Sequence, residues 1–172
     1  MNEMEALNLA LKREQDGQKF YSEAAAKSTN AKGKEVFTWL AREEEGHINL
    51  LEKQIAHVRE SGKWLDEEKW ASSGHISQPI ERTEIPSKID AMGDLDASAP
   101  ELKVLKAAIE AEKNDVSFYE DAAKATSDPS GKAMLMRLAE VEKGHEALLE
   151  EEYEWLSKSK ALFTLHRFSL AR

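Results

Sequence analysis

Two copies of one pattern of acidic and imidazole side chains are the residues of this sequence best suited to chemistry. Glu14 is followed by Glu44 and His47, and the same three residue types return 98 positions later. The six residues are Glu14, Glu44, His47, Glu112, Glu142 and His145. Because residues three apart project from nearly the same side of a helix, Glu44 and His47 can hold one metal ion together. Carboxylates and imidazoles repeated in this way are the ligand set of a dinuclear metal site inside a four-helix bundle.

The repeat extends well beyond these six residues. Residues 7–52 align with residues 105–150 without a gap, and 17 of the 46 positions are identical. Each half is therefore predicted to form one helical hairpin. The predicted fold is all-α, a four-helix bundle made of two repeated hairpins.

Composition excludes several other kinds of function. The net charge of -9 and pI near 5.2 argue against nucleic-acid binding, which needs a basic surface. The absence of cysteine excludes disulfides, thiolate metal sites and a cysteine nucleophile. No segment approaches the roughly 18 apolar residues of a membrane span, and no targeting pattern opens the sequence. We therefore expect a cytoplasmic protein that binds neither nucleic acid nor membranes.

Apolar periodicity and capping residues predict the long helices. The predicted ranges are about 3–28, 31–60, 100–126 and 129–156. Asn2 and Glu5 can form a capping box at the first helix. Asp128 can cap the fourth helix, with Pro129 in its first turn. Together the four helices predict one bundle domain over residues 1–156.

The stretch 61–98 has no sustained period and is predicted to be a long crossover connection. Trp64, Leu65 and Trp70 are expected to form a short helical turn, and residues 76–89 an extended strap over the bundle. A free linker is the alternative, although linkers are usually poor in such apolar residues. We expect the helix after the crossover to begin at the same end of the bundle as the first helix.

The C-terminal tail, residues 157–172, is predicted to be helical, and it is basic and amphipathic, with four basic residues and no acidic one. Docking against the acidic bundle or a partner subunit is the favoured interpretation. Membrane contact is the alternative, but the segment is short and weakly basic for that role.

The single glutamates Glu14 and Glu112 lie in apolar stripes. Glu14 lies seven residues after Leu7 and seven before Tyr21, so it should face the core, and Glu112 has the same register. Four buried ionised carboxylates are untenable unless they are protonated or matched by positive charge. Two divalent cations would match them. Oxygen-rich ligation without sulfur suits iron or manganese, although zinc can also bind.

Three further residues are candidates around this site. Asp115 lies three residues after Glu112, where the first half has Gly17, so it is either a fifth ligand or a surface aspartate. Tyr21 and Tyr119 are candidate residues of catalysis that can donate hydrogen bonds to the ligands or quench radicals. The alternative is that both are core aromatics.

At these residues the sequence resembles the rubrerythrin branch of the ferritin-like superfamily, over essentially residues 3–156. The resemblance implies a ferritin-like four-helix bundle holding two iron ions. It implies Glu44 and Glu142 as bridging carboxylates, with Glu14 and Glu112 as more terminal ligands.

The resemblance also implies an activity. Rubrerythrins reduce hydrogen peroxide at a diferrous site, with electrons from a rubredoxin-like module that has four cysteines. This sequence has no cysteine, so we expect an external electron donor such as a rubredoxin-like protein. Asp115 takes the position of a further carboxylate ligand in that family. We expect the chain to be a homodimer.

Two other functions fit the same ligands. Bacterioferritins share the two Glu-x-x-His motifs, so a ferroxidase that oxidises ferrous iron with dioxygen for storage or delivery is the first alternative. A non-catalytic bundle holding a structural metal such as zinc is the second.

Overall fold

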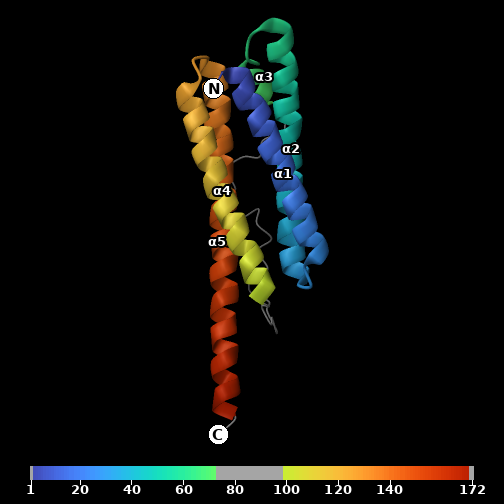
Figure 1. Cartoon of the computed structure of the whole chain (residues 1–172), viewed down its shortest axis with the longest axis vertical. Coiled ribbons are helices and arrows are strands. Elements are labelled where there is room, and N and C mark those ends of the chain that lie inside the picture. The colour runs from blue at the N-terminus through green and yellow to red at the C-terminus, as the bar shows by residue number, and fades with distance from the viewer. Residues whose placement is uncertain (1, 73–98, 171–172) are drawn as a thin grey trace.

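A computed structural model describes residues 2–72 and 99–170, with side chains described for residues 2–72 and 101–158. Within these ranges the chain forms helices and no strand. The helices are α1 (Glu3–Lys27), α2 (Ala31–Ser61), α3 (Glu67–Ala71), α4 (Ala99–Ala125) and α5 (Pro129–Leu170) (Figure 1). The predicted all-α bundle is thus confirmed.

Local capping explains where the long helices begin and end. Asn2 accepts a hydrogen bond from the Glu5 backbone while the Glu5 side chain accepts one from Asn2, which completes the predicted capping box. Asp128 accepts hydrogen bonds from two backbone N–H groups in the first turn of α5, and Pro129 is the first residue of that helix. Gly62 ends α2 at φ 68°, a left-handed conformation that favours glycine.

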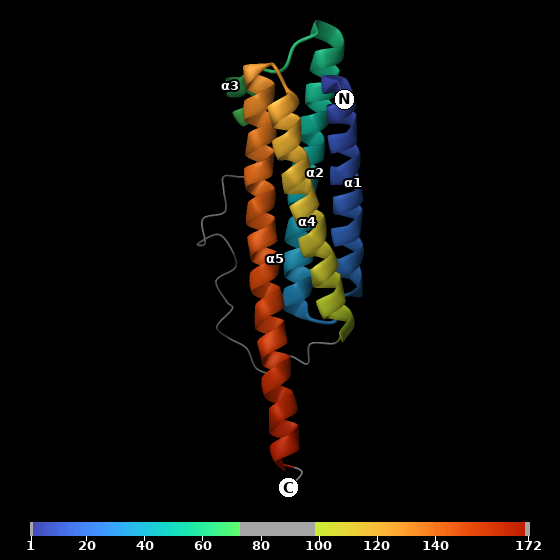
Figure 2. The same ribbon diagram turned by 60° about the vertical axis from the view of Figure 1, so that its left-hand side comes forward.

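The two hairpins, α1 with α2 and α4 with α5, pack with opposite polarity (Figure 2). Leu7 near the start of α1 packs in one cluster with Tyr119 near the end of α4. Tyr21 near the end of α1 packs in another with Leu105 near the start of α4. The expectation that the helix after the crossover begins at the same end as α1 is therefore wrong.

This polarity explains the length of the crossover. The pseudo-twofold axis that relates the hairpins runs across the bundle, so α2 ends at one end of the bundle and α4 begins at the other. The two helix ends that the crossover joins therefore lie at opposite ends of the bundle. The predicted strap at 76–89 lies outside the described residues.

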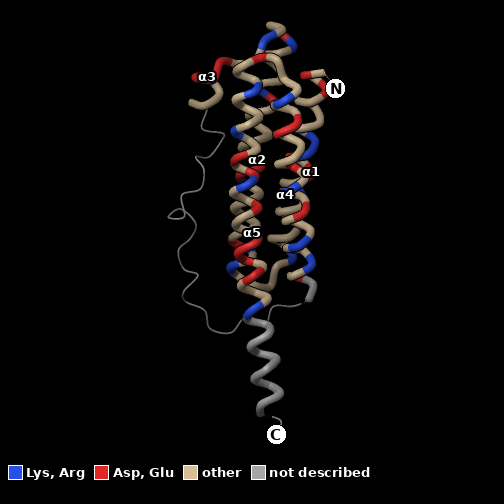
Figure 3. Tube along the Cα trace, turned by 90° about the vertical axis from the view of Figure 1, so that its left-hand side faces the viewer, with Lys and Arg blue, Asp and Glu red and all other residues tan. Residues whose placement is uncertain are grey.

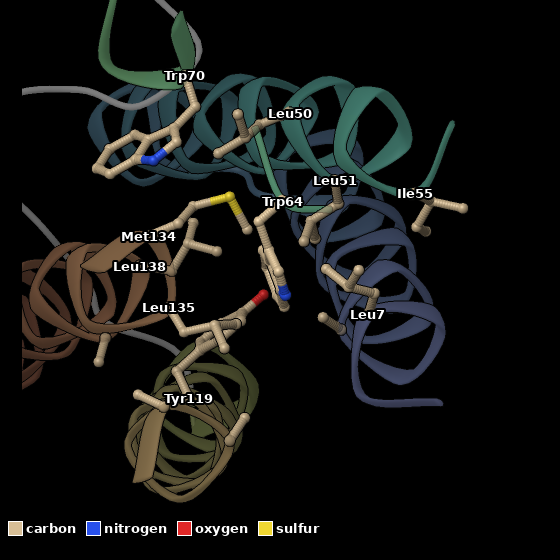
Figure 4. Close-up of a cluster of buried hydrophobic side chains, with 14 residues drawn as sticks. Leu7, Leu50, Leu51, Ile55, Trp64, Trp70, Tyr119, Met134, Leu135 and Leu138 are labelled. Carbon is tan, nitrogen blue, oxygen red and sulfur yellow. The ribbon is translucent and has the colours of Figure 1, made fainter. Parts of the chain in front are cut away.

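The short helix α3 covers the end of the bundle where α4 turns into α5. Of the three residues predicted to form a short helical turn, Trp70 lies in α3, whereas Trp64 and Leu65 precede it. Trp64 and Trp70 are buried. Their indole nitrogens donate hydrogen bonds to Glu3 at 3.0 Å and to Ser130 at 3.1 Å. The Trp64 ring lies among the apolar side chains of both hairpins (Figure 4) and directly over Gly131.

Two apolar clusters, each built from both hairpins, form the core. Leu50 belongs to one and Leu40 to the other, and both are fully buried. Full burial of a leucine side chain contributes roughly 1.5–3 kcal/mol. The predicted ligands lie on the helical turns between the two clusters, so apolar layers enclose them from both ends of the bundle.

The helix predicted to end near residue 156 continues to Leu170 as part of α5. Its C-terminal part extends past the ends of the other helices (Figure 1). The predicted tail is therefore helical in continuity with the bundle. Whether it docks on the bundle or on a partner subunit stays a prediction.

Acidic and basic residues are interspersed along the helices (Figure 3). Ion pairs such as Lys113–Glu150 at 2.9 Å and Lys143–Glu120 at 2.6 Å join α4 to α5. Water screens such exposed pairs, so they contribute little to stability. None of the helices over the described ranges has the length and apolarity needed to cross a membrane.

Candidate metal centre

The structure brings together all six side chains of the repeated pattern. Each long helix contributes: Glu14 from α1, Glu44 with His47 from α2, and the equivalent residues from α4 and α5. All six are buried, with exposed fractions of 0–4%. A buried layer of four carboxyl groups and two imidazoles therefore crosses the middle of the bundle.

The six side chains form two overlapping groups, each with ligand atoms within 4.8 Å of one another. The first group is Glu14, Glu44, His47 and Glu142, and the second is Glu44, Glu112, Glu142 and His145. Glu44 and Glu142 belong to both groups. Each group thus contains one histidine, one glutamate of its own and two shared glutamates.

The histidines point their Nδ1 atoms towards the carboxylates. His47 Nδ1 lies 3.1 Å from an oxygen of Glu14 and 3.1 Å from one of Glu142. His145 Nδ1 lies 2.7 Å from the other oxygen of Glu142. The imidazole rings lie nearly parallel, with centroids 5.9 Å apart. The Glu142 carboxylate therefore lies between the two histidines.

The hydrogen bonding of this layer is incomplete, and a metal ion would complete it. Among the described residues, His145 Nδ1, which faces the carboxylates, has no hydrogen bond of good geometry. Both Glu142 oxygens also lack a hydrogen bond of good geometry, although histidine nitrogens lie close to them. Buried polar atoms are seldom left unsatisfied. Oxygen and nitrogen donors converging in two groups fit two cations, with oxygen-rich ligation suited to iron or manganese.

Burial and neighbouring charges shift the pKa values of the glutamates and histidines in this layer. Burial, reinforced by neighbouring carboxylates, raises the pKa of Glu44 and of Glu112 well above the ordinary value. Burial opposes a charge on His47, but the carboxylates of Glu14 and Glu142 outweigh it and raise the pKa of His47. Burial likewise opposes the charge on Glu142, yet the two histidines lower its pKa. Protons thus occupy part of the layer when cations do not.

The two tyrosines hydrogen-bond across the pseudo-twofold axis. Tyr21 on α1 donates to Glu112 on α4, and Tyr119 on α4 donates to Glu14 on α1. Both rings are almost fully buried, and burial, with the nearby carboxylates, raises the pKa of both hydroxyls. Each hydroxyl therefore stays protonated and fixes the orientation of a glutamate that belongs to one group only.

Asp115 lies near the layer but in neither group of candidate ligands. Its carboxylate forms an ion pair with Arg13 of α1, and the two side chains are 23% and 29% exposed. Burial raises the pKa of Asp115 to about 6, although Arg13 lowers it in part. Ligation of a metal by Asp115 stays a prediction.

A cleft of about 570 Å³ opens between α1 and α4 and leads to the layer. Carboxylates of both groups line it, together with Gly17 and the Arg13–Asp115 pair. Phe20 and Phe118 lie at equivalent places along it. The cleft is the route by which small molecules can reach the buried carboxylates.

Sequence reasoning did not predict two neighbours of this layer. Trp39 packs edge-on against the His145 ring, with centroids 5.5 Å apart, and its counterpart in the second half is Arg137. The second neighbour that was not predicted is Arg13, the ion-pair partner of Asp115. No sequence signal singles out either residue, because 29 of the 46 aligned positions differ between the two halves.

No curated protein matches the sequence. The fold is similar to that of a hypothetical protein from Pyrococcus furiosus, with a TM-score of 0.68, 24% sequence identity and 93% of each chain covered. The sequence pattern of the family described as Rubrerythrin matches residues 5–153. The chain therefore belongs to the rubrerythrin family.

Proposed function

We propose that this protein is a non-haem diiron oxidoreductase that reduces hydrogen peroxide with electrons from a separate donor protein. The observation that carries the proposal is that Glu44 and Glu142 belong to both ligand groups. Two carboxylates shared in this way can bridge two metal ions, which suits ions roughly 3.5 to 4 Å apart. Membership of the rubrerythrin family supports the same conclusion.

The donor atoms match two divalent ions in number and charge. Each ion would have one histidine and one glutamate of its own, with Glu44 and Glu142 bridging. Four carboxylates and two divalent cations are neutral overall, which removes the need to bury protonated acids. Iron fits this oxygen-rich donor set, and manganese or zinc can occupy it as well.

The proposed reaction is a two-electron reduction. Hydrogen peroxide takes up two electrons and two protons, its O–O bond breaks, and two water molecules leave. Two ferrous ions supply one electron each when they are bound. The chain's own residues shape the surroundings: the apolar clusters exclude bulk water, Tyr21 and Tyr119 hold Glu112 and Glu14, and the cleft admits a small oxidant.

Electrons must then return to the centre from outside these 172 residues. The 172 residues contain no cysteine, so they hold no four-cysteine iron site of the rubredoxin kind. We propose a rubredoxin-like protein as the donor, and a homodimer as the form in solution.

Iron oxidation for storage or delivery is the second candidate. It is favoured by Asp16 and Asp121, two exposed acids that line the cleft beside the buried carboxylates and would attract cations in competition with their ion-pair partners Lys12 and Lys124. A large closed shell of many chains would support storage, whereas a dimer would support the oxidoreductase.

The test is to load the metal-free protein anaerobically with ferrous iron and mix it with hydrogen peroxide or dioxygen in a stopped-flow spectrometer. Fast oxidation by peroxide and slow oxidation by dioxygen is the expected result. The opposite order would favour the ferroxidase. No oxidation by either, with full occupancy by zinc, would favour a non-catalytic metal-binding bundle.

A further inference from the structure

The two halves differ at two positions of the cleft, and the differences are linked. Arg13 in the first half corresponds to Ala111 in the second, and Gly17 corresponds to Asp115. The pseudo-twofold axis relates the two halves of the repeat. It therefore places Ala111 opposite Gly17 in the way that Arg13 lies opposite Asp115. All four residues line the cleft.

On one side of the axis, the cleft is closed by side chains. Arg13 on α1 forms its ion pair with Asp115 on α4, which spans the space between the hairpins. The Arg13 guanidinium also lies over the Phe118 ring, 5.1 Å from its centroid. Two contacts thus hold this long side chain across the cleft.

On the other side, the equivalent positions carry almost no side chain. A Cβ at Gly17 would lie 3.5 Å from the Glu44 carboxyl carbon, so this backbone lies directly over a shared carboxylate. Ala111 is exposed and carries one methyl group. The cleft therefore gives access to Glu44 beside Gly17 and Ala111.

We propose that the gap between Gly17 and Ala111 is the access route to the centre for metal ions and small oxidants, and that the Arg13–Asp115 pair closes the equivalent route on the other side of the axis. The inference rests on the metal centre proposed above. Ions and oxidants would then reach this nearly symmetric centre from one side only. The residues that cause the difference do not themselves need to bind metal.

The test measures the rate at which the metal-free full chain takes up Co²⁺, followed by its visible absorbance after rapid mixing. Ala111→Leu should slow uptake roughly tenfold or more, the effect of an added barrier of about 1.4 kcal/mol, and leave the final amount of bound metal unchanged. Ala56→Leu is the matched control, because Ala56 is an exposed alanine of α2 that does not line the cleft.

A second variant separates blocked access from a damaged site. Adding Arg13→Ala to Ala111→Leu opens the other side of the cleft and should restore fast uptake. Uptake by Ala111→Leu as fast as by the control would overturn the inference, and so would a double variant that stays slow or fails to fill. If the unaltered chain takes up no Co²⁺, the metal centre itself is refuted.

Discussion

At the scale of single residues, the four site glutamates are chemically alike but hold unequal positions. Glu44 and Glu142 are shared between the ligand groups, whereas Glu14 and Glu112 each belong to one group and accept a tyrosine hydrogen bond. Removing a shared carboxylate should therefore affect both metals, and removing an unshared one should affect mainly one.

Glu44→Ala is expected to abolish stable binding of both ions, whereas Glu14→Ala should keep about one of the two ions per chain. Metal analysis after anaerobic loading and gel filtration measures this. Glu45→Ala, an exposed neighbour on the same helix, is the control and should bind as the unaltered chain does. Normal loading of Glu44→Ala would refute the ligand assignment.

Tyr21→Phe removes the hydroxyl that donates to Glu112 and leaves that carboxylate free to rotate. Loss of such an orienting partner typically lowers metal affinity roughly 10–100-fold. Competition with a chromophoric chelator measures the change, and Tyr119→Phe should behave alike because of the repeat. Tyr153→Phe, which lies away from the layer, should change nothing. Unchanged affinity in both site variants would show that the tyrosines are only core aromatics.

At the scale of helices and turns, the most constrained contact is the one between Trp64 and the first turn of α5. A Cβ placed at Gly131 would lie 2.4 Å from the Trp64 ring. At the equivalent Gly33, the nearest atom is the Ser28 Oγ at 3.1 Å, a small side chain that can move.

Gly131→Ala is therefore expected to destabilise the fold by about 1–3 kcal/mol through overpacking. Gly33→Ala should be near neutral or stabilising, because alanine favours a helix over glycine by about 1 kcal/mol. Urea unfolding of both metal-free variants gives the comparison. Equal effects of the two substitutions would mean that Trp64 does not pack on α5 as described.

The helices themselves were predictable because their signals are local. The capping residues Asn2 and Asp128 and the apolar periodicity fixed four helices to within a few residues, except that α5 continues to Leu170. The polarity of the second hairpin was not predictable in this way. Periodicity defines which face of a helix is buried but not the direction in which the helix crosses its partner.

The ligand layer was predictable because charged residues are unusual in the apolar stripe of a helix. Glutamates placed in an apolar stripe at the same register in both halves have few interpretations other than a shared buried site. The Arg13–Asp115 pair was not predicted, because it joins residues 102 positions apart on different hairpins. Only the packing of α1 against α4 brings them together.

At the scale of the whole molecule, two apolar clusters are separated by a layer of ionisable groups, so stability depends on what balances that layer. Without metal, Glu44, Glu112 and His47 have raised pKa values and hold protons that the unfolded chain releases. Such groups stabilise the fold at low pH, and the contribution is lost as pH rises through the folded-state pKa.

The metal-free protein should therefore lose stability between pH 5 and pH 8, by about 1.4 kcal/mol for each unit by which a pKa is raised. The pKa of Glu142 is lowered, so its contribution to stability is lost as pH falls. This loss occurs only below the ordinary glutamate pKa near 4.5 and does not affect the range from pH 5 to pH 8. Saturating Mn²⁺ should reverse the trend, because binding displaces protons and tightens as pH rises. Thermal unfolding in chelator and in Mn²⁺ measures both. A metal-free protein that becomes steadily more stable from pH 5 to pH 8 would contradict this electrostatic account.

The most direct measurement is anomalous X-ray diffraction at the iron edge from crystals loaded anaerobically with ferrous iron. We predict two anomalous peaks per chain, roughly 3.5 to 4 Å apart, both within bonding distance of Glu44 and Glu142, with His47 at one and His145 at the other. A single peak per chain, or peaks away from these shared carboxylates, would contradict a dinuclear centre at this layer.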